Sequence, residues 1–184
     1  FLWLGIMERN IMVAAREKVL HSMVNKTFIP EGEAAPASQI GATLEALAAT
    51  IAARRDADEA SYTYRLLTGN VDGVLKKVME ESGEVALAAK DVEATEAGGT
   101  TTGAETADGG ADFPLSVQLP PEYGEAVDHL RYEAADVVYH LLVVLERYGI
   151  TLDEFAAELN NRMTEGERPH GAVRLHDEFV RRGK

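Results

Sequence analysis

Two long segments with helical periodicity constrain the fold of this 184-residue chain more than any other feature. In residues 71–92 and 122–148, apolar side chains recur every three or four positions, the spacing that places them on one face of an α-helix. The first stripe is Val71, Val74, Val78, Val85 and Ala88, and the second is Leu130, Ala134, Val137, Leu141, Val144 and Tyr148. Two amphipathic helices of this length predict a helical bundle.

Shorter helical segments flank the two long ones. A three-to-four spacing of apolar residues predicts a helix from Gln39 to the sequence RRDAD, and a further helix is possible at 7–21. The sequence TLDE, from Thr151 to Glu154, is a capping box that opens a last helix reaching about Met163. No segment has a convincing strand pattern, so we expect an all-α fold.

Composition shifts along the chain predict its domain organisation. Residues 1–38 form an N-terminal extension expected to be partly disordered, and residues 39–163 form one domain. A Gly/Thr/Ala-rich acidic tract within about 93–121 interrupts this domain as a flexible insertion, because it has almost nothing to bury. Residues 164–184 form a C-terminal tail with a weak terminal helix.

The charge and the residue types exclude several classes of function. A formal net charge of −13 disfavours nucleic acid as a partner, because phosphate backbones require an excess of Lys and Arg. The absence of cysteine rules out disulfides and thiolate metal sites and fits a cytoplasmic protein. No apolar run approaches the length of a membrane span, and the opening FLWLGIMERN lacks the basic start of a signal peptide.

Acidic residues interrupt the apolar stripe of the first long helix. Glu81 takes a stripe position one turn from Val78 and from Val85, and Glu80 and Glu84 lie at the edge of the same stripe. Such positions normally hold Leu or Val, so three carboxylates here require a separate explanation.

The second long helix repeats this arrangement. Glu133, Asp136 and His140 stand at i, i+3 and i+7 and flank its apolar face. If the two helices pack as antiparallel neighbours, four carboxylates converge in a partly dry groove, where like charges repel one another. Mg²⁺ or Mn²⁺ removes that conflict, because these hard cations bind carboxylate oxygens.

A second interpretation remains open from the residues alone. Acidic pairs with the same spacing also occur where we expect solvated helix faces, as at Asp56/Glu59 and Glu93/Glu96. The chain could then be a non-enzymatic helical oligomerisation module. Such a module predicts no stabilisation by Mg²⁺.

Two long stretches of the sequence, taken in order, resemble a known family. ASYTYRLLTGNVDGVLKKVMEESGEVALAAKD at 60–91, followed by EAADVVYHLLVVLERYGITLDEFAAEL at 133–159, resembles the phosphoribosyl-ATP pyrophosphohydrolases of histidine biosynthesis. This family belongs to the all-α, MazG-like nucleotide pyrophosphohydrolases. The resemblance covers about 39–163. It implies hydrolysis of phosphoribosyl-ATP to phosphoribosyl-AMP and pyrophosphate, with Mg²⁺ as cofactor.

The resemblance also implies a set of metal ligands. The ExxE…ExxD signature of the superfamily falls on Glu81, Glu84, Glu133 and Asp136. One of the glutamates that the metal does not fully engage, Glu80 or Glu81, would orient or deprotonate the attacking water.

Five further residues are candidates for substrate binding: Lys77, Lys90, Arg65, Tyr62 and His140. Each has an ordinary structural alternative. Lys77 could instead pair with Glu81, Lys90 could complement the helix dipole, and Tyr62 could simply pack. His140 is expected to hydrogen-bond near the metal rather than to bind it, because hard cations prefer oxygen.

This chain departs from the family pattern in two places. Glu84 and Glu133 are separated by 48 residues, an interval that is normally short, and the low-complexity tract accounts for most of the excess. Met79 stands where many relatives carry glycine. Without cysteine, the chain is not expected to carry the zinc-dependent cyclohydrolase activity that is often fused to this domain.

Two expectations concern substrate and assembly. A house-cleaning pyrophosphohydrolase acting on dNTPs would use the same carboxylates, so it remains the alternative enzyme. Two long and two short helices form a thin layer for so many Val and Leu residues, which suggests self-association. The resemblance implies a homodimer that completes a four-helix core.

Overall fold

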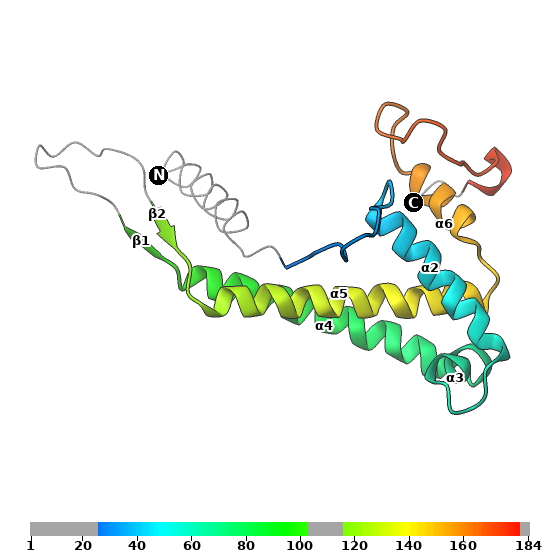
Figure 1. The fold of residues 1–184 in the computed structure, drawn as a ribbon, viewed down its shortest axis with the longest axis horizontal. Coiled ribbons are helices and arrows are strands. Elements are labelled where there is room, and N and C mark those ends of the chain that lie inside the picture. The colour runs from blue at the N-terminus through cyan, green and yellow to red at the C-terminus, as the bar shows by residue number, and fades with distance from the viewer. Residues whose placement is uncertain (1–25, 103–115, 181–184) are drawn as a thin grey trace, which may run out of the picture. The chain divides into compact units, whose positions relative to one another are not determined.

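The computed structural model describes residues 26–102 and 116–180, and most of their regular structure is α-helical (Figure 1). The helices are α2 (Gln39–Ala53), α3 (Tyr62–Thr68), α4 (Val71–Ala97), α5 (Glu122–Arg147) and α6 (Leu152–Asn160). Single 3₁₀ turns span Arg54–Asp56 and Asp177–Phe179, and two short strands are β1 (Thr100–Thr102) and β2 (Ser116–Gln118). The predicted all-α class is confirmed.

The chain divides into two compact units, and each long helix contributes to both. Of the described residues, the first unit comprises 26–34, 81–102 and 116–135, and the second comprises 35–80 and 136–180. The division falls between Glu80 and Glu81 in α4, and between Ala135 and Asp136 in α5.

The second unit contains the hydrophobic core of the described chain. Its buried members are Ile51, Leu66, Leu67, Val74, Leu142, Val143 and Leu145. They come from α2, α3, the first turns of α4 and the second half of α5, and Leu152 and Phe155 of α6 pack against them. Burial of such aliphatic side chains, at about 1.5–3 kcal/mol each, is the main force that holds these helices together.

One arginine connects α5 to the end of α3 within this unit. The Arg147 guanidinium donates hydrogen bonds to the carbonyl oxygens of Leu66 and Leu67, at 2.8 and 2.9 Å, and to that of Gly69, at 2.7 Å. The last carbonyls of a helix have no partner within the helix, and they carry its negative dipole end. The Arg147 guanidinium therefore supplies hydrogen-bond donors to these carbonyls and also places a positive charge at the negative end of the helix dipole.

The helix boundaries follow from local sequence chemistry. Ser38 and Ser61 cap α2 and α3 through their side-chain oxygens, and Asn70 accepts a hydrogen bond from the Asp72 amide at the start of α4. Gly149 has a φ of +69°, the left-handed conformation that favours glycine after a helix. The Ile150 amide reaches back to the Leu145 carbonyl at 2.9 Å, which completes a Schellman motif at the end of α5.

The predicted capping box at the start of α6 is confirmed. The Thr151 hydroxyl accepts a hydrogen bond from the Glu154 amide at 3.1 Å, and the Glu154 carboxylate accepts one from the Thr151 amide at 3.0 Å. These bonds to the ionised carboxylate, chiefly that from the backbone of Thr151, lower the pKa of Glu154. Helix α6 ends at Asn160, three residues before the predicted end.

In the first unit, the later part of α4 and the earlier part of α5 are joined through a short antiparallel ladder. Thr100 pairs with Gln118, and Thr102 pairs with Ser116. The expectation that the chain has no strands was therefore wrong. Three Thr residues are good strand formers, but within a Gly/Thr/Ala tract they resembled a low-complexity loop.

The extent of α4 also corrects the sequence prediction. The helix continues to Ala97, so residues 93–97 belong to it and not to a flexible loop. Glu96, expected on a solvated face, is buried at 7% exposure. The possible helix at 7–21 and the centre of the insertion, residues 103–115, lie outside the described residues. Among the described helices, none has the length and apolar character that crossing a membrane requires.

We expect Thr151→Ala to lower the free energy of unfolding by about 1 kcal/mol, because it removes the side-chain cap of α6. Thermal denaturation followed by circular dichroism measures the change. Thr50→Ala is the control, because Thr50 is exposed within α2 and alanine favours a helix interior. Equal stability of the two variants would show that the capping box contributes nothing.

Candidate metal centre

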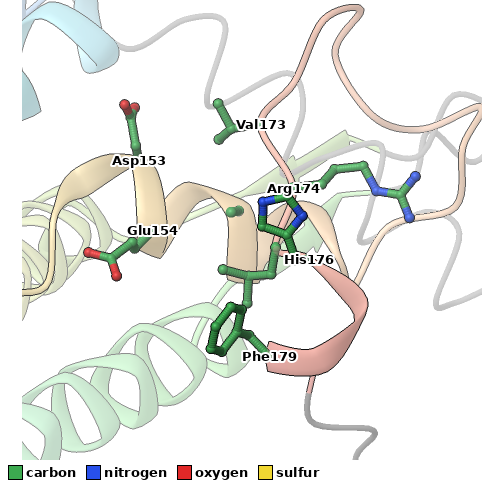
Figure 2. A pocket seen from close by; sticks show the side chains of 8 residues that line it. Asp153, Glu154, Val173, Arg174, His176 and Phe179 are labelled. Atoms are coloured by element: carbon green, nitrogen blue, oxygen red, sulfur yellow. The ribbon is translucent and has the colours of Figure 1, made fainter.

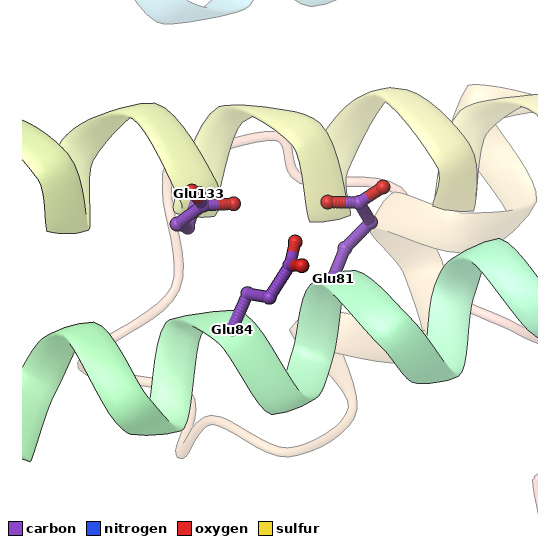
Figure 3. Close-up of side chains that lie close together, drawn as sticks. All are labelled: Glu81, Glu84 and Glu133. Atoms are coloured by element: carbon purple, nitrogen blue, oxygen red, sulfur yellow. The ribbon is translucent and has the colours of Figure 1, made fainter.

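Three carboxylates from two helices meet in the first unit. Glu81 and Glu84 project from α4 and Glu133 projects from α5, and one oxygen of each lies within 4.8 Å of the others (Figure 3). The i, i+3 spacing places Glu81 and Glu84 on adjacent turns of one helix face. Glu133 faces them from the neighbouring helix. Among the described residues, this is the group of acidic and histidine side chains that could surround a metal ion.

Burial makes these carboxylates unusual. Glu81 is 5% exposed and Glu133 is 7% exposed, whereas Glu84 is exposed. Removing an ionised carboxylate from water costs several kcal/mol unless a cation or hydrogen-bond donors compensate. The donor set consists of hard oxygen ligands with an opening on the Glu84 side, which suits Mg²⁺ or Mn²⁺ and not a thiophilic metal.

The fourth expected ligand is Asp136, which does not belong to the first unit. It follows Glu133 by one turn of α5, is half-buried, and is the first residue of α5 that belongs to the second unit. Its backbone carbonyl lies 2.9 Å from Nδ1 of His140. Its role as a ligand remains a prediction.

A histidine that the sequence analysis missed touches the carboxylate group. Nε2 of His129 lies 2.9 Å from Oε1 of Glu133, four residues later on α5. The signal was present in the sequence as an i, i+4 pair on a helix, the spacing at which side chains meet.

Glu80 and Lys77 form an ion pair on α4. The Lys77 ammonium lies 3.2 Å from Oε2 of Glu80, three residues later. Glu80 is exposed, and it directly precedes the buried Glu81. An ion pair as exposed as this one contributes little to stability.

Lys90, near the end of α4, pairs with an exposed acid. Its ammonium donates to Glu93 at 2.6 Å, and this carboxylate raises the pKa of Lys90. Both side chains are exposed, so the contact is a surface pair that a phosphate could replace.

In the second unit, Tyr62 and His140 contact each other although they are 78 positions apart. The Tyr62 hydroxyl lies 3.1 Å from Nε2 of His140, and the two rings meet edge to face. A carbonyl can only accept, so the proton of a hydrogen bond to Asp136 must reside on Nδ1 of His140. In the neutral ring, Nε2 is then an acceptor and the Tyr62 hydroxyl donates to it.

Arg65 lies beside this pair. Its guanidinium donates to the carbonyl oxygens of Glu59 and Ala60, at 2.7 and 3.0 Å, and its terminal carbon lies 6.0 Å from the centre of the Tyr62 ring. The structure thus brings together Arg65, Tyr62 and His140, three of the five residues predicted to bind substrate.

A separate pocket of about 300 Å³ lies in the second unit, between α6 and the C-terminal segment (Figure 2). Four of its lining residues are apolar (Ala157, Val173, Leu175 and Phe179), and four carry charged or titratable side chains (Asp153, Glu154, Arg174 and His176). None of the predicted site residues lines it, so the carboxylate group is the better candidate site.

The comparison with protein families now identifies the chain's relatives. Residues 44–163 match the model of the family described as phosphoribosyl-ATP pyrophosphohydrolase. The chain belongs to this family. The matched range contains every predicted site residue, from Tyr62 to His140.

Individual relatives agree with the family match. A phosphoribosyl-ATP pyrophosphatase of Paracidovorax citrulli is 35% identical over 134 residues, which cover 70% of this chain and 76% of the relative. One from Limosilactobacillus fermentum is 34% identical over 65% of this chain and 82% of the relative. The histidine biosynthesis bifunctional protein HisIE of Halalkalibacterium halodurans is 35% identical, and the match spans 66% of this chain and 41% of that protein. No solved structure matched the chain significantly.

We expect Mg²⁺ to raise the melting temperature of the chain and Glu84→Gln to abolish that rise. A ligand at a hundred times its Kd adds about 2.7 kcal/mol, or roughly 5–10 °C for a chain of this size. Differential scanning calorimetry with Mg²⁺ or with EDTA measures the difference. Glu93→Gln, also on the exposed side of α4, should retain the full rise, and an unchanged rise in Glu84→Gln would contradict the site.

Proposed function

We propose that this chain hydrolyses phosphoribosyl-ATP to phosphoribosyl-AMP and pyrophosphate, in the second step of histidine biosynthesis. The observation that carries the proposal is the meeting of Glu81, Glu84 and Glu133 within the range that matches the family. The names of the relatives from two organisms support the same reaction. Membership in a family of hydrolases leaves the non-enzymatic module without support.

The carboxylate group would hold Mg²⁺, with Mn²⁺ as a possible substitute. Glu81, Glu84 and Glu133 supply oxygen donors from two helices, and Asp136, one turn after Glu133, would add a fourth. Bound Mg²⁺ supplies charge neutralisation for the phosphate oxygens of the substrate.

The side chains around this group have separate tasks in the hydrolysis. Glu80 or Glu81 would orient the attacking water and accept its proton. Release of pyrophosphate requires the water to attack at the linkage between the α- and β-phosphates. Lys77, paired with Glu80 at 3.2 Å, would contact a phosphate and so keep a positive charge beside the catalytic carboxylate.

The remaining contacts would recognise the rest of the nucleotide. Lys90 would reach a phosphate after releasing Glu93, and Arg65 would bind a phosphate or stack on the base. Tyr62 and His140, already joined by a hydrogen bond, would provide a rigid pair for contacts with ribose or base. We propose a cytoplasmic location, which suits a cysteine-free enzyme of biosynthesis.

The exposed apolar side chains of α4 support a homodimer. Leu75 is 41% exposed, Met79 is 77% exposed and Leu87 is 68% exposed, at spacings of four and eight residues along the helix. A stripe of this kind is costly in water and normally packs against another helix. A second copy of the chain would cover it and complete a four-helix core.

The enzymatic proposal predicts release of pyrophosphate from phosphoribosyl-ATP that depends on Mg²⁺. Glu84→Ala and Asp136→Ala should each lower kcat by at least about 100-fold, because loss of a metal ligand should exceed the 10–100-fold effect of an outer-shell partner. A coupled pyrophosphate assay measures the rate, and circular dichroism should show unchanged helix content. Glu45→Ala, an exposed acid on α2, is the control.

A panel of dNTPs in the same assay separates the two enzymatic candidates. A higher kcat/KM for phosphoribosyl-ATP than for any dNTP supports the role in histidine biosynthesis. A higher kcat/KM for a dNTP would instead support the house-cleaning pyrophosphohydrolase. Near-normal turnover in Glu84→Ala would remove the metal site from the mechanism.

For the dimer, we expect sedimentation velocity at micromolar concentration to give twice the mass of the 20.0 kDa chain. Met79→Glu and Leu87→Glu should shift the protein towards the monomer, because each would bury an unpaired charge in the interface. Phe179→Glu, which changes an exposed aromatic residue in the C-terminal segment, should remain dimeric. A wild-type monomer would contradict the assembly.

A further inference from the structure

We infer that His129 is a positioning residue of the metal centre, where it holds the carboxylate of Glu133 in its ligating orientation. This inference rests on the proposed metal site. It assigns a role to a side chain that the signature of four acids does not include.

The two side chains lie within hydrogen-bonding distance of each other. Nε2 of His129 lies 2.9 Å from Oε1 of Glu133, and the residues are four apart on α5. A carboxylate oxygen that is ionised can only accept, so Nε2–H is the donor. The Glu133 side chain is 9% exposed and that of His129 is 56% exposed, so a solvated ring reaches a nearly buried carboxylate.

The bond restricts the motion that most affects ligation. A glutamate side chain has three rotatable bonds, and the lone pairs that bind a metal turn with the final one. With Oε1 held by His129, the carboxylate keeps one plane and presents its remaining lone pairs in a fixed direction. Ligating carboxylates are commonly held by such outer hydrogen bonds, and their loss costs 10–100-fold in metal affinity.

Two other roles for His129 make different predictions. As a direct ligand, its ring nitrogen would have to lie among the carboxylate oxygens, but the described group consists of Glu81, Glu84 and Glu133 alone. As a cation that merely neutralises Glu133, the ring would compete with the metal, and its removal would strengthen binding. A positioning role requires that removal weakens binding, so the sign of the change separates these roles.

Isothermal titration of the metal-free full chain with Mn²⁺ and with Mg²⁺ tests the inference. We expect His129→Ala to raise the Kd by about 10-fold or more. His129→Gln should restore most of the affinity, because its amide can donate to the same oxygen without a charge. Arg131→Ala is the control: this nearby cation is 63% exposed and pairs with Asp128, so its removal should not weaken binding.

A kinetic measurement adds a second readout. If His129 acts through the metal site, His129→Ala should need more Mg²⁺ for half-maximal rate and should recover most of its kcat at saturating Mg²⁺. General damage to the fold would lower kcat at every Mg²⁺ concentration instead.

The outcomes separate this inference from the function on which it rests. Unchanged or tighter binding by His129→Ala, with binding still lost in Glu84→Gln, would overturn the positioning role and leave the metal centre intact. An equal loss of metal affinity in His129→Ala and His129→Gln would also overturn the positioning role, because a side chain that donates a hydrogen bond would then not restore binding. If the wild type binds neither ion, both the metal centre and the role of His129 fail, and the pyrophosphate assay reports on the activity independently.

Discussion

Burial of negative charge between two helices is the constraint on which the rest of this structure depends. Glu81 and Glu133 are almost completely enclosed, and Glu84 lies within 4.8 Å of both. Burying an ionised carboxylate costs several kcal/mol unless a cation or hydrogen-bond donors compensate, a requirement that hydrophobic side chains at these positions would not have. Such a costly arrangement persists where function requires it, and a divalent cation resolves the conflict by turning repulsion into shared coordination.

The hydrophobic core lies in the second unit, and the carboxylate group lies in the first. The second unit holds the aliphatic core from α2, α3, α4, α5 and α6, and the Arg147 bonds join two of these helices. In the described part of the first unit, the buried hydrophobic side chains are Ala88 and Tyr123, and the other buried residues are acids. Because α4 and α5 run through both units without a break, the helices whose ends are secured in the core also carry the carboxylates.

Much of the helical architecture was predictable because its determinants are local. Apolar periodicity identified α2, α4 and α5, and the TLDE sequence identified the start of α6. The mistakes lie at the end of α4 and in the two strands. α4 was expected to end near residue 92, but it continues through an Ala- and Glu-containing stretch to Ala97, directly before Gly98 and Gly99. The pairing of β1 with β2 depends on two segments brought together by the helices that precede and follow them.

The sequence by itself determined that acids interrupt two apolar stripes at helical spacing, and therefore that they face a shared groove if the helices are neighbours. Only the tertiary structure decided which side chains meet there. It joined Glu133 to Glu81 and Glu84, added His129, and paired Tyr62 with His140. The physical reason is that spacing along a helix fixes the face on which a residue lies. The relative shift of packed helices and the rotamers of long side chains depend on every contact across the interface.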